Sequence, residues 1–207
     1  IPLRLVGSEM CIRDRRNDGE WRIESTWPPE DRQWQDVALD GCTKSGNSVQ
    51  GVSGGGGTIA SVTFECDAID SMNDILISGL STLHLDVQAS MDGGQIFVEM
   101  QDAETGLRLG HATMDIRYHQ GGSDPTTVLP GQTVTMLMEF QAIDAILPAG
   151  HGIRLVLTET GEDYLAPACG VTCPVTVNGG TLSLPHVIRD GSNVLITPQS
   201  ENAANNQ

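Results

Sequence analysis

The 207-residue chain has few aromatic and few basic side chains. Aromatic residues make up 4% of it, and 11 Lys and Arg stand against 27 Asp and Glu, which gives a formal net charge of −16. Phosphate binding needs clustered Lys and Arg, so the composition argues against nucleic acid as a partner and against adsorption to anionic membrane surfaces. No stretch approaches the roughly eighteen consecutive apolar residues of a membrane-spanning helix.

The sequence also lacks a segment of helical length with an apolar repeat of 3.6 residues; Glu65–Asn73 could form a single helical turn. Apolar and polar residues instead alternate with a period of two, which is typical of antiparallel strands with one buried face. The clearest alternating segments are Ser81–Gln88, Gln95–Gln101, His111–His119, Val134–Phe140 and Ile153–Leu157. The pattern predicts an all-β fold, a β-sandwich of the jelly-roll kind.

Turn-forming residues separate these segments at short intervals, and Glu104-Thr105-Gly106, Pro130-Gly131 and Ala149-Gly150 are predicted turns. Asp92-Gly93-Gly94 predicts a tight hairpin between the strands on its two sides. Proline cannot donate a backbone hydrogen bond to a sheet, so Pro148 and Pro185 are expected at strand ends or edges.

The two ends of the chain differ from the rest. Residues 1–16 contain four Arg against Glu9 and Asp14, a charge of +2 that leaves −18 on residues 17–207. This stretch lacks the apolar centre of a signal peptide and resembles a translated library-adapter sequence, so we predict a non-native leader, with a genuine terminal strand as the alternative. The sandwich is expected over residues 17–190, and residues 191–207 are expected to be a flexible tail.

Four cysteines lie outside the leader: Cys42, Cys66, Cys169 and Cys173. In an exported protein they favour two disulfides, with the first two cysteines closing the Gly-rich stretch 51–57 and the last two pinning a tight loop. Free thiols and a zinc site are the alternatives, although a C-x-x-C pair is absent.

Several motifs look like chemistry without the context that chemistry needs. Gly51–Gly55 matches the G-x-S-x-G nucleophile pattern, and Gly55-x-Gly57-x-x-Ala60 matches half of a dinucleotide-binding fingerprint. Both motifs need a helix next, but the strand-like run Thr58–Phe64 follows instead. Ser53 is therefore expected in a flexible surface loop. His84 and Asp86 are expected on a solvated sheet face rather than around a metal.

The acidic residues Asp67, Asp70 and Asp74 could contribute to a calcium loop, but they lack EF-hand spacing. The polar row of His111–His119 is expected to be exposed or to face a partner. The sequence thus predicts no catalytic, cofactor-binding or metal-binding residue.

Four stretches follow one another in an order found in a known domain: Trp21–Pro29, Asp74–Gly79 with Leu83–Val87, Pro148–Leu155 and Thr181–Pro185. Together they resemble the C-terminal domain of the X-Pro dipeptidyl-peptidase, cocaine-esterase and glutaryl-acylase (CocE/NonD) family of serine hydrolases. The resemblance covers roughly residues 20–188.

The resemblance implies a non-catalytic, galactose-binding-domain-like jelly roll that packs against an N-terminal α/β-hydrolase domain of the same polypeptide. It also implies that Gly79, Gly150, His151 and Arg154 are structural motif positions, with His151 in a structural role. The chain departs from the family pattern at Gly152, in its cysteines and in its acidity, which leaves the parent substrate open.

We therefore expect an accessory domain of an exported serine hydrolase, extracellular or at the cell surface, whose parent enzyme is a dipeptidyl-peptidase or hydrolyses acyl esters or amides. The chain alone is expected to be inert. The alternatives are a carbohydrate-binding module and an adhesive surface module. Trp21, Trp27 and Trp34 are the only tryptophans and precede the main strands, where we expect them to anchor the lead-in segment.

Overall fold

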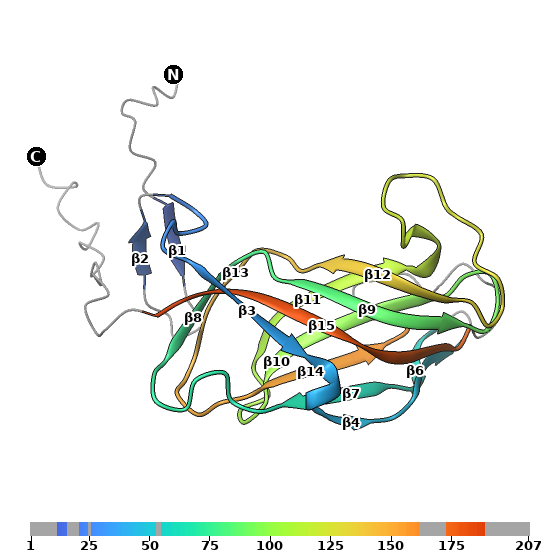
Figure 1. The fold of residues 1–207 in the computed structure, drawn as a ribbon, viewed down its shortest axis with the longest axis horizontal. Coiled ribbons are helices and arrows are strands. Elements are labelled where there is room, and N and C mark those ends of the chain that lie inside the picture. Colours follow the sequence, from blue (N-terminus) through green and yellow to red (C-terminus); the bar gives the residue numbers. More distant parts are fainter. Residues whose placement is uncertain (1–11, 16–20, 25, 53–54, 162–172, 189–207) are drawn as a thin grey trace, which may run out of the picture.

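The computed structural model describes residues 12–15, 21–24, 26–52, 55–161 and 173–188. They form two antiparallel sheets of a β-sandwich and a separate ribbon of β1 (Ile12–Arg15) and β2 (Trp21–Glu24), which lies at one end (Figure 1). The predicted all-β sandwich is confirmed.

The larger sheet has eight strands and is organised around the last of them. Its strands are β3 (Gln33–Ala38), β5 (Ser48–Val52), β6 (Gly55–Ala60), β8 (Ile75–Gly79), β9 (Thr82–Ala89), β12 (Thr133–Glu139), β13 (Ile143–Leu147) and β15 (Val175–Val187). Strand β15 pairs with β5, β9, β3 and β8 in turn along its length (Figure 1). One long strand therefore holds most of this sheet together.

The smaller sheet has five strands in the order β11-β10-β14-β7-β4. They are β4 (Thr43–Ser45), β7 (Val62–Cys66), β10 (Gln95–Asp102), β11 (Arg108–Asp115) and β14 (Ile153–Thr158). Two short 3-10 helices, η1 (Leu39–Gly41) and η2 (Ile116–Tyr118), follow β3 and β11.

The core lies between the sheets and is mainly aliphatic. Along β9 and β12 every second residue is buried, as the period of two predicts. Leu83, Leu85, Met136 and Leu155 are among the fully buried side chains, and each contributes about 1.5–3 kcal/mol by leaving water. Leucine, isoleucine, valine and methionine thus fill most of the core, together with Phe64 and Phe140.

The hairpin predicted at Asp92-Gly93-Gly94 is wrong. Strand β9 belongs to the larger sheet and β10 to the smaller one, so the glycines carry the chain across the sandwich. Gly94 has φ +122°, and a Cβ there would lie 2.5 Å from a methyl group of Val175. Its carbonyl accepts a hydrogen bond from Ile116 N at 2.9 Å, which ties the crossing to η2.

The strand predicted over His111–His119 ends earlier than expected. Strand β11 stops at Asp115, whose Oδ1 accepts from Arg117 N at 2.9 Å and caps η2. A short aspartate side chain competes for the backbone N–H that a longer strand would have used.

The helical turn considered for Glu65–Asn73 is also not formed. Strand β7 continues to Cys66, and in the loop 67–74 Asp70 Oδ1 accepts from Met72 N at 2.7 Å and from Asn73 N at 3.0 Å. The aspartate shapes this loop as an Asx turn instead.

The two prolines behave differently. Pro148 follows the last residue of β13, as expected. Pro185 lies inside β15 opposite Trp34, between Ser183, the last residue paired with β9, and His186, the first paired with β8. The expected position at a strand end or edge is therefore wrong. Pro185 lies where the pairing of β15 changes from β9 to β8, so on that side no strand in the described part of the chain needs a hydrogen bond from it.

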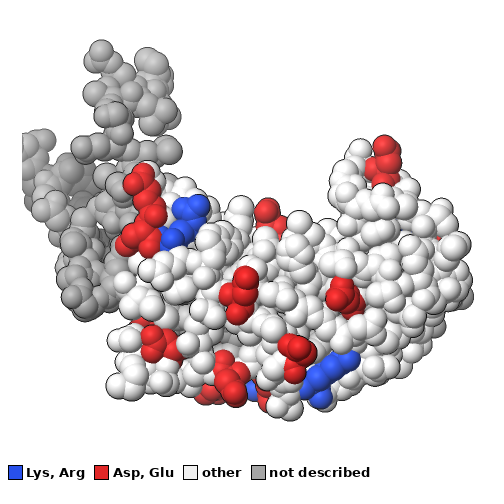
Figure 2. Space-filling view, in the orientation of Figure 1, with Lys and Arg blue, Asp and Glu red and all other residues white. Residues whose placement is uncertain are grey.

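The ends of the chain lie mostly outside the described residues, so the predicted limits of leader, sandwich and tail stay predictions. Figure 2 shows many Asp and Glu side chains and few basic ones on the face in view. Among the described residues, none of the helices is long and apolar enough to span a membrane.

Candidate functional site

The four motif positions that the family resemblance indicated lie in two places. Gly79 ends β8 with φ +137°, and a Cβ there would lie 3.1 Å from the Pro185 ring, so only glycine fits without displacement. Gly150 and His151 lie in the turn 148–152 between β13 and β14, and Arg154 follows in β14.

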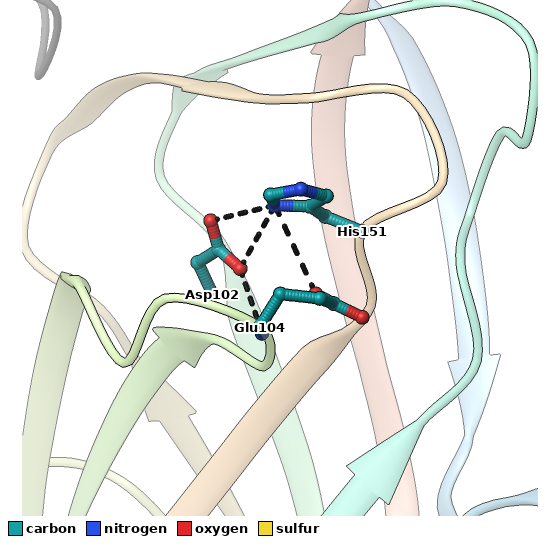
Figure 3. A group of neighbouring side chains, drawn as sticks. All are labelled: Asp102, Glu104 and His151. Carbon is teal, nitrogen blue, oxygen red and sulfur yellow. Dashed lines mark hydrogen bonds and ion pairs between the residues drawn. The ribbon is translucent and has the colours of Figure 1, made fainter.

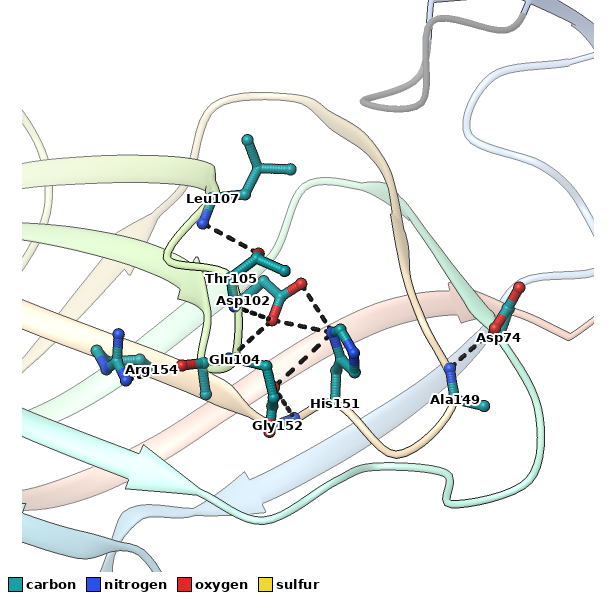
Figure 4. Close-up of polar contacts among 10 residues, drawn as sticks. Asp74, Asp102, Glu104, Thr105, Leu107, Ala149, His151, Gly152 and Arg154 are labelled. Atoms are coloured by element: carbon teal, nitrogen blue, oxygen red, sulfur yellow. Dashed lines mark hydrogen bonds and ion pairs between the residues drawn. The ribbon is translucent and has the colours of Figure 1, made fainter.

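The turn 148–152 is fastened on one side to the loop 67–74. Gly150 adopts φ +80° at the tip of the turn, and its N–H donates to Asp70 O at 2.9 Å. Ala149 N donates to Asp74 Oδ1 at 2.8 Å (Figure 4). Two of the three acidic residues considered as calcium ligands therefore bond to the backbone: Asp70 within its own loop, and Asp74 to the turn 148–152.

On its other side the turn meets the turn 103–107 between β10 and β11. Ala103 N donates to Gly152 O at 3.0 Å, and Gly152 N donates to Glu104 Oε2 at 2.9 Å. Asp102, at the end of β10, accepts from Glu104 N at 3.0 Å and Thr105 N at 3.2 Å. The turn 148–152 is thus the middle member of three interlocked turns (Figure 4).

The centre of this arrangement is an ion pair between His151 and Asp102. The Nδ1 atom of His151 lies 2.9 Å from Asp102 Oδ2 and 3.1 Å from Oδ1, and 3.9 Å from Glu104 Oε2 (Figure 3). The Asp102 side chain is only 4% exposed, whereas that of His151 is 26% exposed. Water therefore reaches the imidazole but hardly reaches the carboxylate.

Hydrogen bonds favour the charged form of both partners. Burial raises the pKa of Asp102, but bonds from His151, Thr105 and Glu104 outweigh it and lower the pKa to about 2. The hydrogen bond to Asp102 raises the pKa of His151; partial burial opposes this, and the charges of Asp102, Glu104 and Asp74 add to it. The pair is a carboxylate and an imidazolium over mildly acidic pH.

Two neighbouring residues hold the strands under the turn. A Cβ on Gly152 would collide with the carbonyl oxygen of Cys66, so glycine lets the two strands approach. Arg154 donates to Glu65 Oε1 at 2.8 Å and to Ala103 O at 2.7 Å. The departure of Gly152 from the family pattern therefore has a packing reason.

The ligand atoms of Asp102, Glu104 and His151 lie within 4.8 Å of one another, the one such group of three or more His, Cys, Asp and Glu side chains in the described part of the chain. Three backbone N–H groups and the imidazole already bond these carboxylates. The backbone N–H groups and the imidazole thus satisfy the carboxylates without a metal ion, as in a structural ion pair.

A histidine whose Nδ1 faces a carboxylate also orients the base of a serine hydrolase. Among the described residues, however, no serine or cysteine side chain is hydrogen-bonded to His151. Ser53, the nucleophile of the G-x-S-x-G match, lies outside the described residues, and strands β5 and β6 flank it where a helix would be required.

The other candidate residues lie elsewhere. His84 and Asp86 project from β9 into solvent, and Asp86 accepts from Thr135 Oγ1 at 2.5 Å. Cys42 and Cys66 form a disulfide, which leaves no thiolate for zinc at these positions. It borders an open hollow of about 230 Å³ that Asp36, Asp67 and Ile69 also line.

The last cysteine pair is described in part. Cys173 is buried and disulfide-bonded, and Cys169 lies outside the described residues. A pairing between these two cysteines therefore stays a prediction.

The fold and the ion pair together define an all-β sandwich with a structural polar cluster. The chain belongs to the X-Pro dipeptidyl-peptidase C-terminal non-catalytic domain family, whose model matches residues 70–193. The family resemblance stated from the sequence is thereby confirmed. No curated protein matches the chain.

Solved structures share the fold at low sequence identity. An aminopeptidase from the marine sediment archaeon Thaumarchaeota archaeon is 11% identical with a TM-score of 0.64, over 86% of this chain and 40% of that one. A CocE/NonD family hydrolase from Staphylococcus aureus is 13% identical with a TM-score of 0.62, over 86% of this chain and 41% of that one. The chain thus spans about two fifths of the length of these two proteins.

Proposed function

We propose that the chain is the accessory C-terminal domain of a longer, dipeptidyl-peptidase-like serine hydrolase. Its role there is to stabilise a catalytic α/β-hydrolase domain and to shape the entrance of the active site. The observation that carries the proposal is the match of residues 70–193 to a family defined as non-catalytic. The parent enzyme acts as a dipeptidyl-peptidase, or hydrolyses simple acyl esters or amides, through an acyl-enzyme.

An exposed aromatic residue offers a surface for such a neighbour. Trp34 in β3 is 54% exposed although its strand is paired with β15. Tryptophan is enriched where protein surfaces meet, because a large flat side chain loses little entropy and buries much area. We assign Trp34 to the contact with the catalytic domain.

Two experiments test the accessory role. The chain is incubated with an aminoacyl-prolyl chromogenic amide and a short acyl ester, and we expect no turnover; turnover that Ser53→Ala abolishes would contradict the proposal. Reading the gene upstream of Asn17 should reveal a G-x-S-x-G elbow within alternating strands and helices. Tandem sandwiches there would instead support an adhesive module.

The contact at Trp34 is tested with the upstream domain expressed as a separate polypeptide. Adding the chain should slow the thermal inactivation of that domain, and Trp34→Ala should reduce the protection. Ile59→Ala is the matched control, because Ile59 is 58% exposed on β6 at the other end of the sandwich (Figure 1). Equal losses from both variants would argue against the assignment of Trp34.

We also propose that the protein is exported to the cell surface or beyond. The support is the disulfide between Cys42 and Cys66 together with the disulfide-bonded Cys173, since such bonds persist in oxidising compartments. Non-reducing mass spectrometry of protein from its native source should find these cysteines without free thiols. Free thiols at Cys42 and Cys66 would remove the argument.

Carbohydrate binding is a second candidate because of the same exposed Trp34. An aromatic platform beside polar groups such as Asp36 and Ser183, which are hydrogen-bonded at 2.5 Å, suits a sugar ring. Glycan-array binding that Trp34→Ala abolishes would favour this function over the accessory role.

A further inference from the structure

Three segments far apart in the sequence meet at one end of the sandwich, and the turn 148–152 lies between the other two. Towards the loop 67–74 it uses backbone and Asp74 contacts, which have no titratable cation. Towards the turn 103–107 it depends on His151, Gly152 and their acidic partners. The two junctions therefore respond differently to pH.

We propose that His151 is a proton-operated latch. With its second proton bound, it draws the turn 148–152 onto the turn 103–107; without that proton, the same two turns separate more readily. The latch belongs to the sandwich itself, so it holds whether or not the chain accompanies a hydrolase domain.

The charges around the imidazole are almost all negative. Asp102 and Glu104 face it from the turn 103–107, and Asp74 acts on it from the loop 67–74. Asp70, in the same loop, is engaged with its own backbone. The first basic residue after the turn in the sequence is Arg154, but its guanidinium is bonded to Glu65 and to the Ala103 carbonyl.

Loss of the proton therefore leaves several acids facing one another without a compensating charge. A neutral imidazole with hydrogen on Nδ1 still donates to Asp102, so the hydrogen bond survives deprotonation. What disappears is the attraction of the imidazolium for Asp102 and for Glu104 at 3.9 Å. Glu104 also accepts a hydrogen bond from Gly152 N. When its attraction to His151 weakens, the link from its side chain to the backbone of the turn 148–152 therefore loosens.

The direction of the pH effect follows from the pKa of His151, which the ion pair raises above its ordinary value. The stabilisation is complete below about pH 6.5, the ordinary histidine value, and is lost as pH rises through the higher value of the folded state. The two turns are thus held more tightly in mildly acidic solution than in alkaline solution.

His151→Asn tests the latch, because the asparagine amide places a permanently neutral donor near the position of Nδ1. Thermal unfolding of the full chain is measured between about pH 5.5 and pH 9, the range around the histidine pKa. We expect the variant to melt below the wild type at the acid end and to match it at the alkaline end. His84→Asn, on the solvated face of β9, should leave that difference unchanged.

Local readouts keep the test decisive if the variant folds poorly. In the wild type, NMR titration of the His151 ring should give a midpoint above the ordinary value, and exchange of the Gly152 amide, corrected for its intrinsic rate, should speed up severalfold through that midpoint. A gap between wild type and His151→Asn that is constant with pH would overturn the proposal. A His151 midpoint at or below the ordinary value would overturn it as well.

Discussion

Two buried acids stand at opposite ends of strand β14, and the structure treats them differently. Asp102 lies beside the start of the strand and is 3% exposed, with His151 and two backbone N–H groups as donors. Glu159 follows the end of the strand and is 1% exposed; its Oε2 accepts from Gly51 N, while its Oε1 has no hydrogen-bond partner among the residues that the structure describes. Burial of a carboxylate is therefore compensated at one end of the strand and only in part at the other.

The difference shows what a buried acid contributes to a fold. A carboxylate with a full set of donors fixes the segments that supply them, whereas an oxygen without a partner carries a desolvation cost. Asp102 accordingly joins the turns 103–107 and 148–152, and Glu159 contributes one bond to β5. Substitution of Asp102 should therefore lower the free energy of unfolding much more than substitution of Glu159.

The largest effect is expected from Asp102→Ala. The change leaves the N–H groups of Glu104 and Thr105 and the imidazole of His151 without their acceptor, which we expect to cost about 3 kcal/mol of the free energy of unfolding. Urea unfolding at neutral pH measures it. Asp86→Ala is the control, because Asp86 is exposed and should change stability by at most about 0.5 kcal/mol.

Gly152→Ala tests the close approach beneath the same turn. The added methyl group meets the Cys66 carbonyl, so β7 or β14 must move, at an expected cost of about 2 kcal/mol. Gly106→Ala has open space around it but a φ of +72°, and it should cost about 1 kcal/mol from backbone strain alone. Equal losses in urea unfolding would mean that the contact with Cys66 is relieved without cost.

Acid should remove the stabilisation that the Asp102 carboxylate provides. The pKa of this carboxyl is lowered to about 2 in the fold, so its stabilisation is present above its ordinary value near 3.8 and is lost as pH falls towards 2. The stability gap between the wild type and Asp102→Asn should narrow over that interval. A gap that stays constant down to about pH 2 would contradict the ion pair.

Glu159→Gln should have the smallest effect and can be of opposite sign. Glutamine keeps an acceptor for Gly51 N and removes the charge, so we expect stability to change by less than about 1 kcal/mol or to rise. A loss as large as that of Asp102→Ala would show that the two acids are equivalent after all.

The comparison also shows which features could be predicted from the sequence and which could not. The period of two in segments such as Ser81–Gln88 predicted the strands, because alternation is a local consequence of strand geometry. Gly150 and His151 were found through their motif. Asp102 and Glu104 were missed, since His151 lies 49 residues from Asp102. The turn at Glu104-Thr105-Gly106 was predicted from its residues, but no local signal indicated the partner of Asp102.

The sequence by itself determined an acidic, all-β chain with an aliphatic core, a family resemblance and the turn at Gly150. The tertiary structure decided that Asp92–Gly94 crosses between sheets, that Pro185 lies within β15, and that His151 contacts Asp102. It also left one oxygen of Glu159 without a hydrogen-bond partner in the described part of the chain. The physical reason is range. Alternation and turn chemistry act over a few residues, whereas sheet membership and the charge of a buried acid depend on strands that only folding brings together.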